Sequence, residues 1–199
     1  LGVSAYNREK YLQLREKFNK YPKVDNQYYI LLYTLILFGF NNQLRFNEQG
    51  EFNLPVGKRD FNIVIEAKFR KFFDTLRQQN CEFHTKDFRN FNFNILTDRS
   101  LVYCDPPYLI TNATYNEKSG WTETDEEDLL RILDMLNLQG VRFALSNVLT
   151  HEGKENCILK EWVERNNYNV HDIFMDYHYS NYQKKTKKAD TREVLITNY

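Results

Sequence analysis

An apolar tetrapeptide that ends in a carboxylate and two prolines constrains the fold of this 199-residue chain more than any other segment. Residues 101–104 (Leu-Val-Tyr-Cys) have the pattern of a buried strand, and Asp105-Pro106-Pro107-Tyr108 follows them directly. Proline fixes its own φ and cannot donate to a sheet, so the strand must stop there and the turn after it must be stiff. In open α/β sheets, ligands bind at this carboxyl edge of the strands. The sequence therefore predicts an α/β fold with a ligand site at this turn.

The residue types in the turn suit a planar ligand that carries an exocyclic amine. The Asp105 carboxylate and the Pro106 carbonyl can accept the two amine hydrogens, while the Tyr108 ring stacks on the face of the ligand. A plain surface turn is the alternative interpretation of an isolated Asp-Pro-Pro-Tyr.

The part of the chain after residue 80 alternates between the patterns of strands and helices, which is typical of an α/β sheet. Strands are expected at residues 81–84, 101–104, 141–145, 170–175 and 194–197, and helices at 125–136 and 154–165. Thr122 or Thr124 and the acidic residues after them are suited to begin the first of these helices.

The part before residue 80 has mainly helical patterns. Helices are expected at residues 7–19, 26–38 and 63–79, and a β-hairpin at about 44–54 with its turn at Gly50. The second helix is apolar nearly all round and is expected to be central. The third carries Phe69, Phe72, Phe73 and Leu76, which are expected in the core. We therefore divide the chain into residues 1–80 and 81–199.

Composition excludes several classes of protein. With 42% hydrophobic residues, the chain can bury a core, and no apolar run is long enough to cross a membrane. The three cysteines have no CxxC spacing and the four histidines have no ligand spacing, so neither a disulfide framework nor a metal site is expected. The formal net charge is zero, with a small excess of basic residues before residue 99 and of acidic residues after it.

The Asp105–Tyr108 turn resembles the DPPY motif of the Dam-like DNA adenine N6-methyltransferases, a family of amino-methyltransferases. Residues 39–47 and 50–59 resemble the DNA-reading segment of that family, and residues 108–121 and 145–156 resemble the segments that follow the motif. These segments occur in the order of the family and cover essentially the whole chain. One feature departs from it: the Gly-rich turn that cradles S-adenosylmethionine (SAM) in the family has no counterpart, and the only early glycine is Gly2. We therefore expect the chain to be the later two-thirds of a Dam-like protein, without the first SAM-binding strands.

The resemblance implies a fold, a reaction and a set of catalytic and cofactor-binding residues. The fold would be the later half of a Rossmann-like SAM-dependent methyltransferase sheet, with an antiparallel final strand inserted near its edge, plus a target-recognition subdomain in residues 1–80. The reaction would transfer a methyl group from SAM to the 6-amino group of a flipped-out adenine in double-stranded DNA, in a short site such as GATC or a close relative. Asp105, Pro106 and Tyr108 would be catalytic, and Asp105, Asp87 and Phe88 would bind SAM. Direct transfer needs no covalent enzyme intermediate, so Cys104 is expected to be a strand residue only. Such an enzyme would work in the cytoplasm of a bacterial or phage-infected cell.

The resemblance also implies a DNA-binding surface around the expected hairpin, where an arginine can pair with guanine in the major groove. Its candidate residues are Phe40, Asn41, Gln43, Arg45, Pro55, Lys58 and Arg59. A core position is the alternative for Phe40, and a solvated surface is the alternative for the two arginines. Gln43 departs from the family, where this site is usually apolar, so strict GATC specificity is not implied. A basic run at residues 184–188 fits either a solvated loop or a contact to phosphate.

Two other functions stay open at this point. A non-catalytic DNA-binding fragment or degenerate paralogue would keep recognition of DNA but lack SAM binding. A related enzyme could instead methylate the 4-amino group of cytosine, or an amine of RNA or protein, although the hairpin resemblance argues against it. The oligomeric state is left open.

Overall fold

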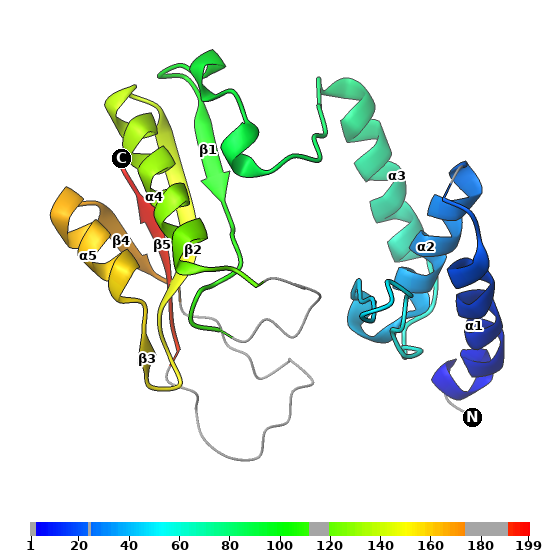
Figure 1. Ribbon diagram of the computed structural model, residues 1–199. Coiled ribbons are helices and arrows are strands. Elements are labelled where there is room, and N and C mark those ends of the chain that lie inside the picture. Colours follow the sequence, from blue (N-terminus) through cyan, green and yellow to red (C-terminus); the bar gives the residue numbers. More distant parts are fainter. Residues whose placement is uncertain (1–2, 24, 112–119, 174–190) are drawn as a thin grey trace. The chain divides into compact units, whose positions relative to one another are not determined.

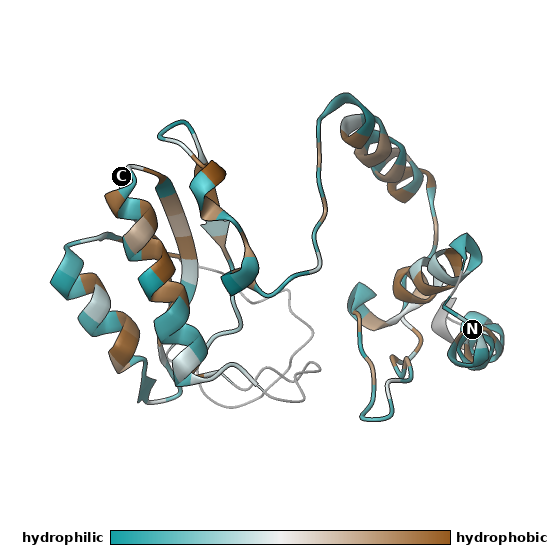
Figure 2. Ribbon diagram, turned by 45° about the horizontal axis from the view of Figure 1, so that its top comes forward, coloured by the Kyte–Doolittle hydropathy of each residue, from teal (hydrophilic) through white to brown (hydrophobic). Residues whose placement is uncertain are grey.

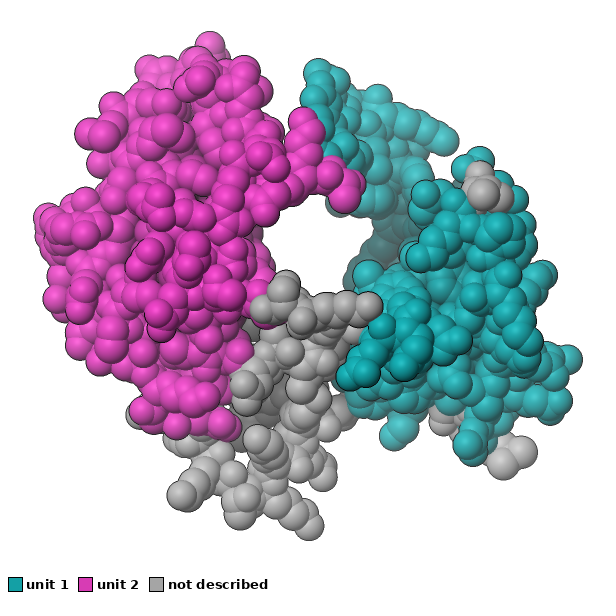
Figure 3. Space-filling view, in the orientation of Figure 1, with its two compact units in different colours: residues 1–84 teal, residues 85–199 magenta. Residues whose placement is uncertain are grey.

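The computed structural model describes residues 3–23, 25–111, 120–173 and 191–199. The chain divides into two compact units, residues 1–84 and 85–199 (Figure 3), and each is described by itself. Residues 114–116 and the basic run at 184–188, both singled out above, lie outside the described residues. No helix in the described part of the chain is long and apolar enough to cross a bilayer.

The first unit is mainly helical (Figure 1). It contains α1 (Val3–Lys20), α2 (Asn26–Phe38), the 3₁₀ turn η1 (Phe40–Asn42) and α3 (Ile63–Gln78). Asp25 caps α2 by accepting a hydrogen bond from the Tyr28 main-chain N–H, and Asn62 caps α3 in the same manner. Its core is formed by α1, α2 and the chain between η1 and α3, through Tyr11, Phe18, Tyr28, Leu31, Leu35, Phe52 and Leu54.

Two expectations for the helices of this unit are wrong. α2 is not central: Tyr28, Leu31 and Leu35 are buried, whereas Tyr29 and Ile30 on its other side are exposed. α3 has no buried residue at all, and the four side chains expected in the core are exposed or half-buried. Tyr33 of α2 does contact Phe69 of α3, with ring centroids 5.0 Å apart. The reason is that a helical period shows which residues share a face but not whether another element covers that face.

The expected hairpin is present as a chain reversal with very short strands. Phe46 and Phe52 form one isolated antiparallel bridge, and Gly50 has the positive φ of 78° that its turn requires. The strands do not extend further because helix α1 supplies the next partner: the Asn19 amide binds both the main-chain N–H and the C=O of Phe52, at 2.8 and 3.1 Å.

The second unit is a sheet with helices on one face (Figure 1). Its elements are η2 (Phe88–Asn90), η3 (Phe93–Ile95), β1 (Leu101–Cys104), α4 (Glu123–Leu138), β2 (Arg142–His151), β3 (Lys154–Glu155), α5 (Cys157–Asn166), β4 (Asn169–Asp172) and β5 (Arg192–Thr197). Helices α4 and α5 pack together on the sheet, and their apolar residues form its main core with β2 and β5 (Figure 2).

The strand order is β1-β2-β5-β4, with β3 paired to the end of β2. β1 and β2 are parallel, whereas β5 is antiparallel to both β2 and β4. The expected insertion of an antiparallel final strand is therefore confirmed. This mixed sheet with helices agrees with the expected Rossmann-like methyltransferase fold. On the sheet face away from α4 and α5, Leu101 and Tyr103 of β1 are 57% and 61% exposed.

Two expected elements of this part of the chain are wrong. Residues 81–84 form no strand, because a segment this short becomes a strand only when a neighbour accepts its hydrogen bonds, and none of the described residues does so. The helix expected from residue 154 begins at Cys157. Lys154 and Glu155 pair with β2 instead, across a tight turn in which Glu152 and Gly153 have positive φ, and Asn156 then caps α5.

Candidate active site and candidate DNA-facing loops

The turn after β1 brings a carboxylate, a phenol and a hydroxyl group together. The Tyr108 hydroxyl donates a hydrogen bond to Asp105 Oδ1 at 3.1 Å and also lies 3.1 Å from Ser146 Oγ of β2. Because the tyrosine proton faces Asp105, the serine hydroxyl is the donor of the second bond. Asp105 is exposed, and among the described residues its other oxygen has no hydrogen-bond partner. Pro106 is half-buried beside it.

Burial determines the protonation of the two other titratable groups at this turn. It raises the pKa of Tyr108 to about 12; the hydrogen bond from Ser146 acts against this shift, and the Asp105 charge adds to it. Burial also raises the pKa of the Cys104 thiol to about 11. Both groups are therefore neutral near pH 7. A neutral thiol is a poor nucleophile, in agreement with a strand role for Cys104.

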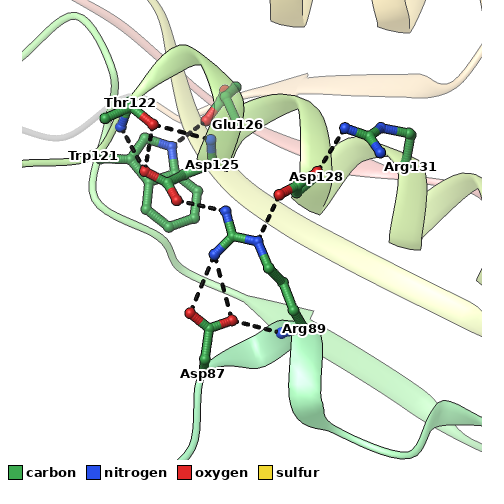
Figure 4. A network of polar contacts seen from close by, with 8 residues as sticks. All are labelled: Asp87, Arg89, Trp121, Thr122, Asp125, Glu126, Asp128 and Arg131. Carbon is green, nitrogen blue, oxygen red and sulfur yellow. Dashed lines mark hydrogen bonds and ion pairs between the residues drawn. The ribbon is translucent and has the colours of Figure 1, made fainter.

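The segment before β1 is held to helix α4 by one arginine (Figure 4). Arg89 binds three carboxylates, which are Asp87 at 3.1 Å, Asp125 at 2.5 Å and Asp128 at 2.6 Å, and we call these four residues the Arg89 clasp. Hydrogen bonds to Asp125 and Asp128 raise the pKa of Arg89, so it stays charged. The Arg89 guanidinium also lies over the Phe88 ring, 4.5 Å from its centroid. Asp87 and Phe88, the expected SAM contacts, are thus both engaged by Arg89.

A fully buried carboxylate lies near the first turn of α4. Glu126 accepts hydrogen bonds from Trp121 Nε1 at 2.7 Å, Asn147 Nδ2 at 3.0 Å and Asn156 Nδ2 at 2.9 Å. The Trp121 ring in turn packs against Phe88, with centroids 5.7 Å apart. These contacts join α4, β2, the start of α5 and the η2 segment.

In the other unit, two loops that carry candidate DNA-binding residues lie side by side. The Phe40 N–H donates to the Pro55 carbonyl at 2.8 Å, and the Gly57 N–H donates to the Phe38 carbonyl at 2.7 Å. Gly39 and Gly57 are buried against each other, and a Cβ on Gly57 would overlap the Gly39 carbonyl. η1 is therefore held next to residues 55–57.

Asparagine side chains hold both candidate guanine-reading arginines. Arg45 donates from Nε to Asn53 Oδ1 and from Nη2 to the Asn53 carbonyl, while Arg59 donates to Asn42 Oδ1 at 2.9 Å. The Asn42 amide is itself bound to carbonyls at the end of α2.

The remaining candidates lie in the same two loops. Asn41 has the left-handed φ of 52°, Phe40 is 37% exposed, Gln43 is half-buried, and Pro55 and Lys58 are exposed. A core position for Phe40 is therefore not what the structure has. The candidate catalytic and SAM-binding residues all belong to the other unit.

Helix α1 fixes the returning half of the hairpin through three side chains spaced four residues apart. Tyr11 and Arg15 both donate to the Leu54 carbonyl, at 3.1 and 3.2 Å, and Asn19 binds Phe52 as described above. Residues at this spacing share one face of a helix, so α1 takes the place of a neighbouring strand.

Sequence reasoning assigned no role to several residues that the structure places at these sites. They are Asn42, Asn53, Arg89, Glu126 and Ser146. One signal for Glu126 was available: it lies three and four residues before Leu129 and Leu130, which places a charge on the apolar face of α4. The other four have no such signal, because each depends on a partner that folding brings near.

Comparison with known proteins agrees with this architecture. Residues 3–191 match the D12 class N6 adenine-specific DNA methyltransferases. The chain belongs to that family. The match includes both the Asp105–Tyr108 turn and the paired loops of the other unit.

Several curated members of this methyltransferase family are similar to the chain. It is 42% identical over 204 residues to the type II methyltransferase M.FokI of Planomicrobium okeanokoites and 38% identical to the modification methylase StsI of Streptococcus sanguinis. Each match covers 100% of this chain but 30% of the relative. The DNA adenine methylase of Escherichia coli K12 is 30% identical over 161 residues, which cover 79% of this chain and 54% of that protein. The chain thus spans under a third of the first two relatives and about half of the third.

Proposed function

We propose that this protein transfers a methyl group from SAM to the 6-amino group of an adenine in double-stranded DNA. The observation that carries the proposal is the Asp105–Tyr108 turn at the carboxyl end of β1, in a chain that matches the adenine-specific family over residues 3–191. The names of the relatives, a type II methyltransferase, modification methylases and DNA adenine methylases, support a place in a bacterial restriction–modification system. Such a protein acts in the cytoplasm of a bacterial or phage-infected cell.

The target adenine would leave the helix stack, because its amino group is hidden inside a duplex. In this proposal Tyr108 stacks on the flipped base, and the Asp105 carboxylate and Pro106 carbonyl accept its two amino hydrogens. Asp105 has an oxygen without a hydrogen-bond partner among the described residues, and Ser146 holds the Tyr108 hydroxyl, so both side chains are oriented before the base arrives. Correct orientation of reacting groups is worth up to about 7–11 kcal/mol in model reactions.

SAM, when bound, supplies an electrophilic methyl group, and the nitrogen attacks it directly. We propose that Asp105, Asp87 and Phe88 contact the cofactor. An exposed carboxylate such as Asp105 fits the ammonium group of SAM. Asp87 and Phe88 are held by the Arg89 clasp, so their contribution is tested separately, by calorimetric titration of SAM into Phe88→Ala.

We further propose that the paired loops of residues 1–80 read the DNA, in a site that is GATC or closely related. The candidate residues Phe40, Asn41, Gln43, Arg45, Pro55, Lys58 and Arg59 lie in two adjacent loops of one unit, and four of the seven are exposed or hold an exposed guanidinium. Arg45 is positioned by Asn53 and keeps donors for the O6 and N7 atoms of guanine. Gln43 replaces the usual apolar residue, so the outer base pairs may be read differently from GATC.

Transfer of labelled methyl groups from SAM to a GATC duplex, compared with a matched GTTC duplex, tests the function. The intact natural protein and the 199-residue chain are assayed side by side. Incorporation into the GATC duplex alone supports the proposal. Specific DNA binding by the intact protein without any transfer would replace it with the alternative, a non-catalytic DNA-binding module.

A further inference from the structure

Glu126 is a buried charge that the proposed chemistry does not use. It is 0% exposed, and none of its three hydrogen-bond donors, Trp121, Asn147 and Asn156, carries a charge. A carboxylate withdrawn from water is costly unless hydrogen bonds replace its hydration. A carboxylate in this position therefore needs all of its donors.

The donors cannot exchange roles with acceptors. Asn147 Oδ1 accepts the Val148 N–H at 2.8 Å, and Asn156 Oδ1 accepts the Leu159 N–H at 3.1 Å. Each asparagine must therefore turn its NH₂ group toward Glu126. An indole can only donate, so the third group is fixed as well. The position requires a side chain that accepts at both of its terminal atoms, which a carboxylate does and a carboxamide does not.

One end of this network reaches the turn after β1. Asn147 and Ser146 are neighbours on β2 and point to opposite faces of the sheet. Asn147 binds Glu126 on the helix side, and Ser146 binds the Tyr108 hydroxyl on the other side. The orientation of β2 at this point is thus shared by both contacts.

The other end reaches the segment before β1. Trp121 binds Glu126 Oε2 and packs against Phe88, a proposed SAM contact. The Arg89 clasp holds the same segment to the outer side of α4 (Figure 4). Glu126 fixes the indole ring against which Phe88 rests.

We propose that Glu126 is a positioning residue for methyl transfer, which holds the Trp121–Phe88 pair and the β2 segment behind Tyr108 in one geometry. This role rests on the proposed function. Glu126 touches neither base nor cofactor, and its effect on catalysis passes through Trp121 and Asn147.

Three variants of the intact protein test this role: Glu126→Gln, Trp121→Phe and the double variant. In Glu126→Gln, the new NH₂ group must face either the indole N–H or the two asparagine NH₂ groups. We expect kcat/KM for SAM to fall at least about tenfold, with the duplex Kd within about twofold. Trp121→Phe removes one of the opposed donors, so the glutamine can turn its oxygen toward both asparagines. The double variant should therefore recover at least about half of the thermal stability lost by Glu126→Gln, and kcat/KM for SAM should rise with it. Glu127→Gln, an exposed neighbour on α4, is the matched control.

Three results would count against the proposal. A Glu126→Gln protein with unchanged kcat/KM and melting temperature would overturn it. So would a double variant that is less stable than Glu126→Gln, because the donor argument would then be wrong even if the single variant fails to fold. Absence of methyl transfer by the wild-type protein would instead overturn the proposed function on which this role rests.

Discussion

Arg45 donates two hydrogen bonds to Asn53, from Nε to the side-chain Oδ1 at 2.8 Å and from Nη2 to the main-chain carbonyl at 2.9 Å. The two residues lie on the two arms of the chain reversal around Gly50. This pairing removes rotational freedom from the guanidinium before any ligand binds. An arginine held in this manner loses less entropy when it pairs with a base.

Asn53→Ala should therefore weaken base discrimination without removing the arginine. We expect the preference for a cognate over a single-base-changed duplex to fall by about tenfold, since an arginine–guanine pair is worth about 1–3 kcal/mol of discrimination. Competition binding with duplexes changed at each position measures this effect. Gln49→Ala, exposed at the same turn, serves as the control. Unchanged discrimination in Asn53→Ala would exclude a role for Asn53 in positioning Arg45.

Asp105→Ala should abolish methyl transfer and leave DNA binding nearly intact, because the carboxylate is proposed to act on the target amine and the candidate DNA-binding residues belong to the other unit. We expect the duplex Kd to stay within about threefold of wild type, a difference below about 1 kcal/mol. Single-turnover transfer and fluorescence anisotropy measure the two quantities. Near-normal turnover would contradict the catalytic role of Asp105.

Tyr108→Phe keeps the stacking ring but removes the hydrogen bonds to Asp105 and Ser146. We expect kcat to fall by about tenfold, since each such bond contributes about 0.5–1.5 kcal/mol. Tyr108→Ala should lose far more, because the ring itself is absent. Equal activities of the two variants would show that the ring has no stacking role.

Gly57→Ala should destabilise the first unit, because the new methyl group would overlap the Gly39 carbonyl. Over-packing of this kind typically costs about 1–3 kcal/mol. Thermal unfolding measures the loss, and DNA binding should weaken with it as the two candidate DNA-facing loops separate. An unchanged melting temperature would mean that the loops can move apart without cost.

The Arg89 clasp should weaken in acid. Hydrogen bonds from Thr122 and Arg89 lower the pKa of Asp125 from 3.8 to about 2, so the folded state keeps this carboxylate charged where the unfolded chain would protonate it. Its contribution to stability is complete above pH 3.8 and disappears as the pH falls toward about 2. Wild type should therefore be more stable than Asp125→Asn at about pH 6, and the difference should shrink in acid. Urea unfolding of both proteins across this range measures it, and a difference that does not change with pH would contradict the assignment.

Local patterns in the sequence predicted most of the elements. The strand at residues 101–104 and its proline-terminated turn, the helices beginning at Asn26 and Ile63, and the Thr122 cap of α4 all follow from apolar period, capping residues and proline. The errors at residues 81–84 and 154–156 share a cause: a strand depends on a partner strand, and no local pattern reveals one. The exposed aromatic residues of α3 show the same limit for helices, because the period marks a face and not its neighbour.

The candidate site divides along the same line. By itself, the sequence determined which residue types stand at the end of β1 and in the two candidate DNA-facing loops, since proline, glycine and their spacing act over a few residues. Only the tertiary structure decided that Ser146 meets Tyr108, that Asn53 holds Arg45, and that Glu126 collects its three donors. Hydrogen bonds are short and directional, so partners far apart in the sequence meet only when the packing of helices and strands brings them within about 3 Å.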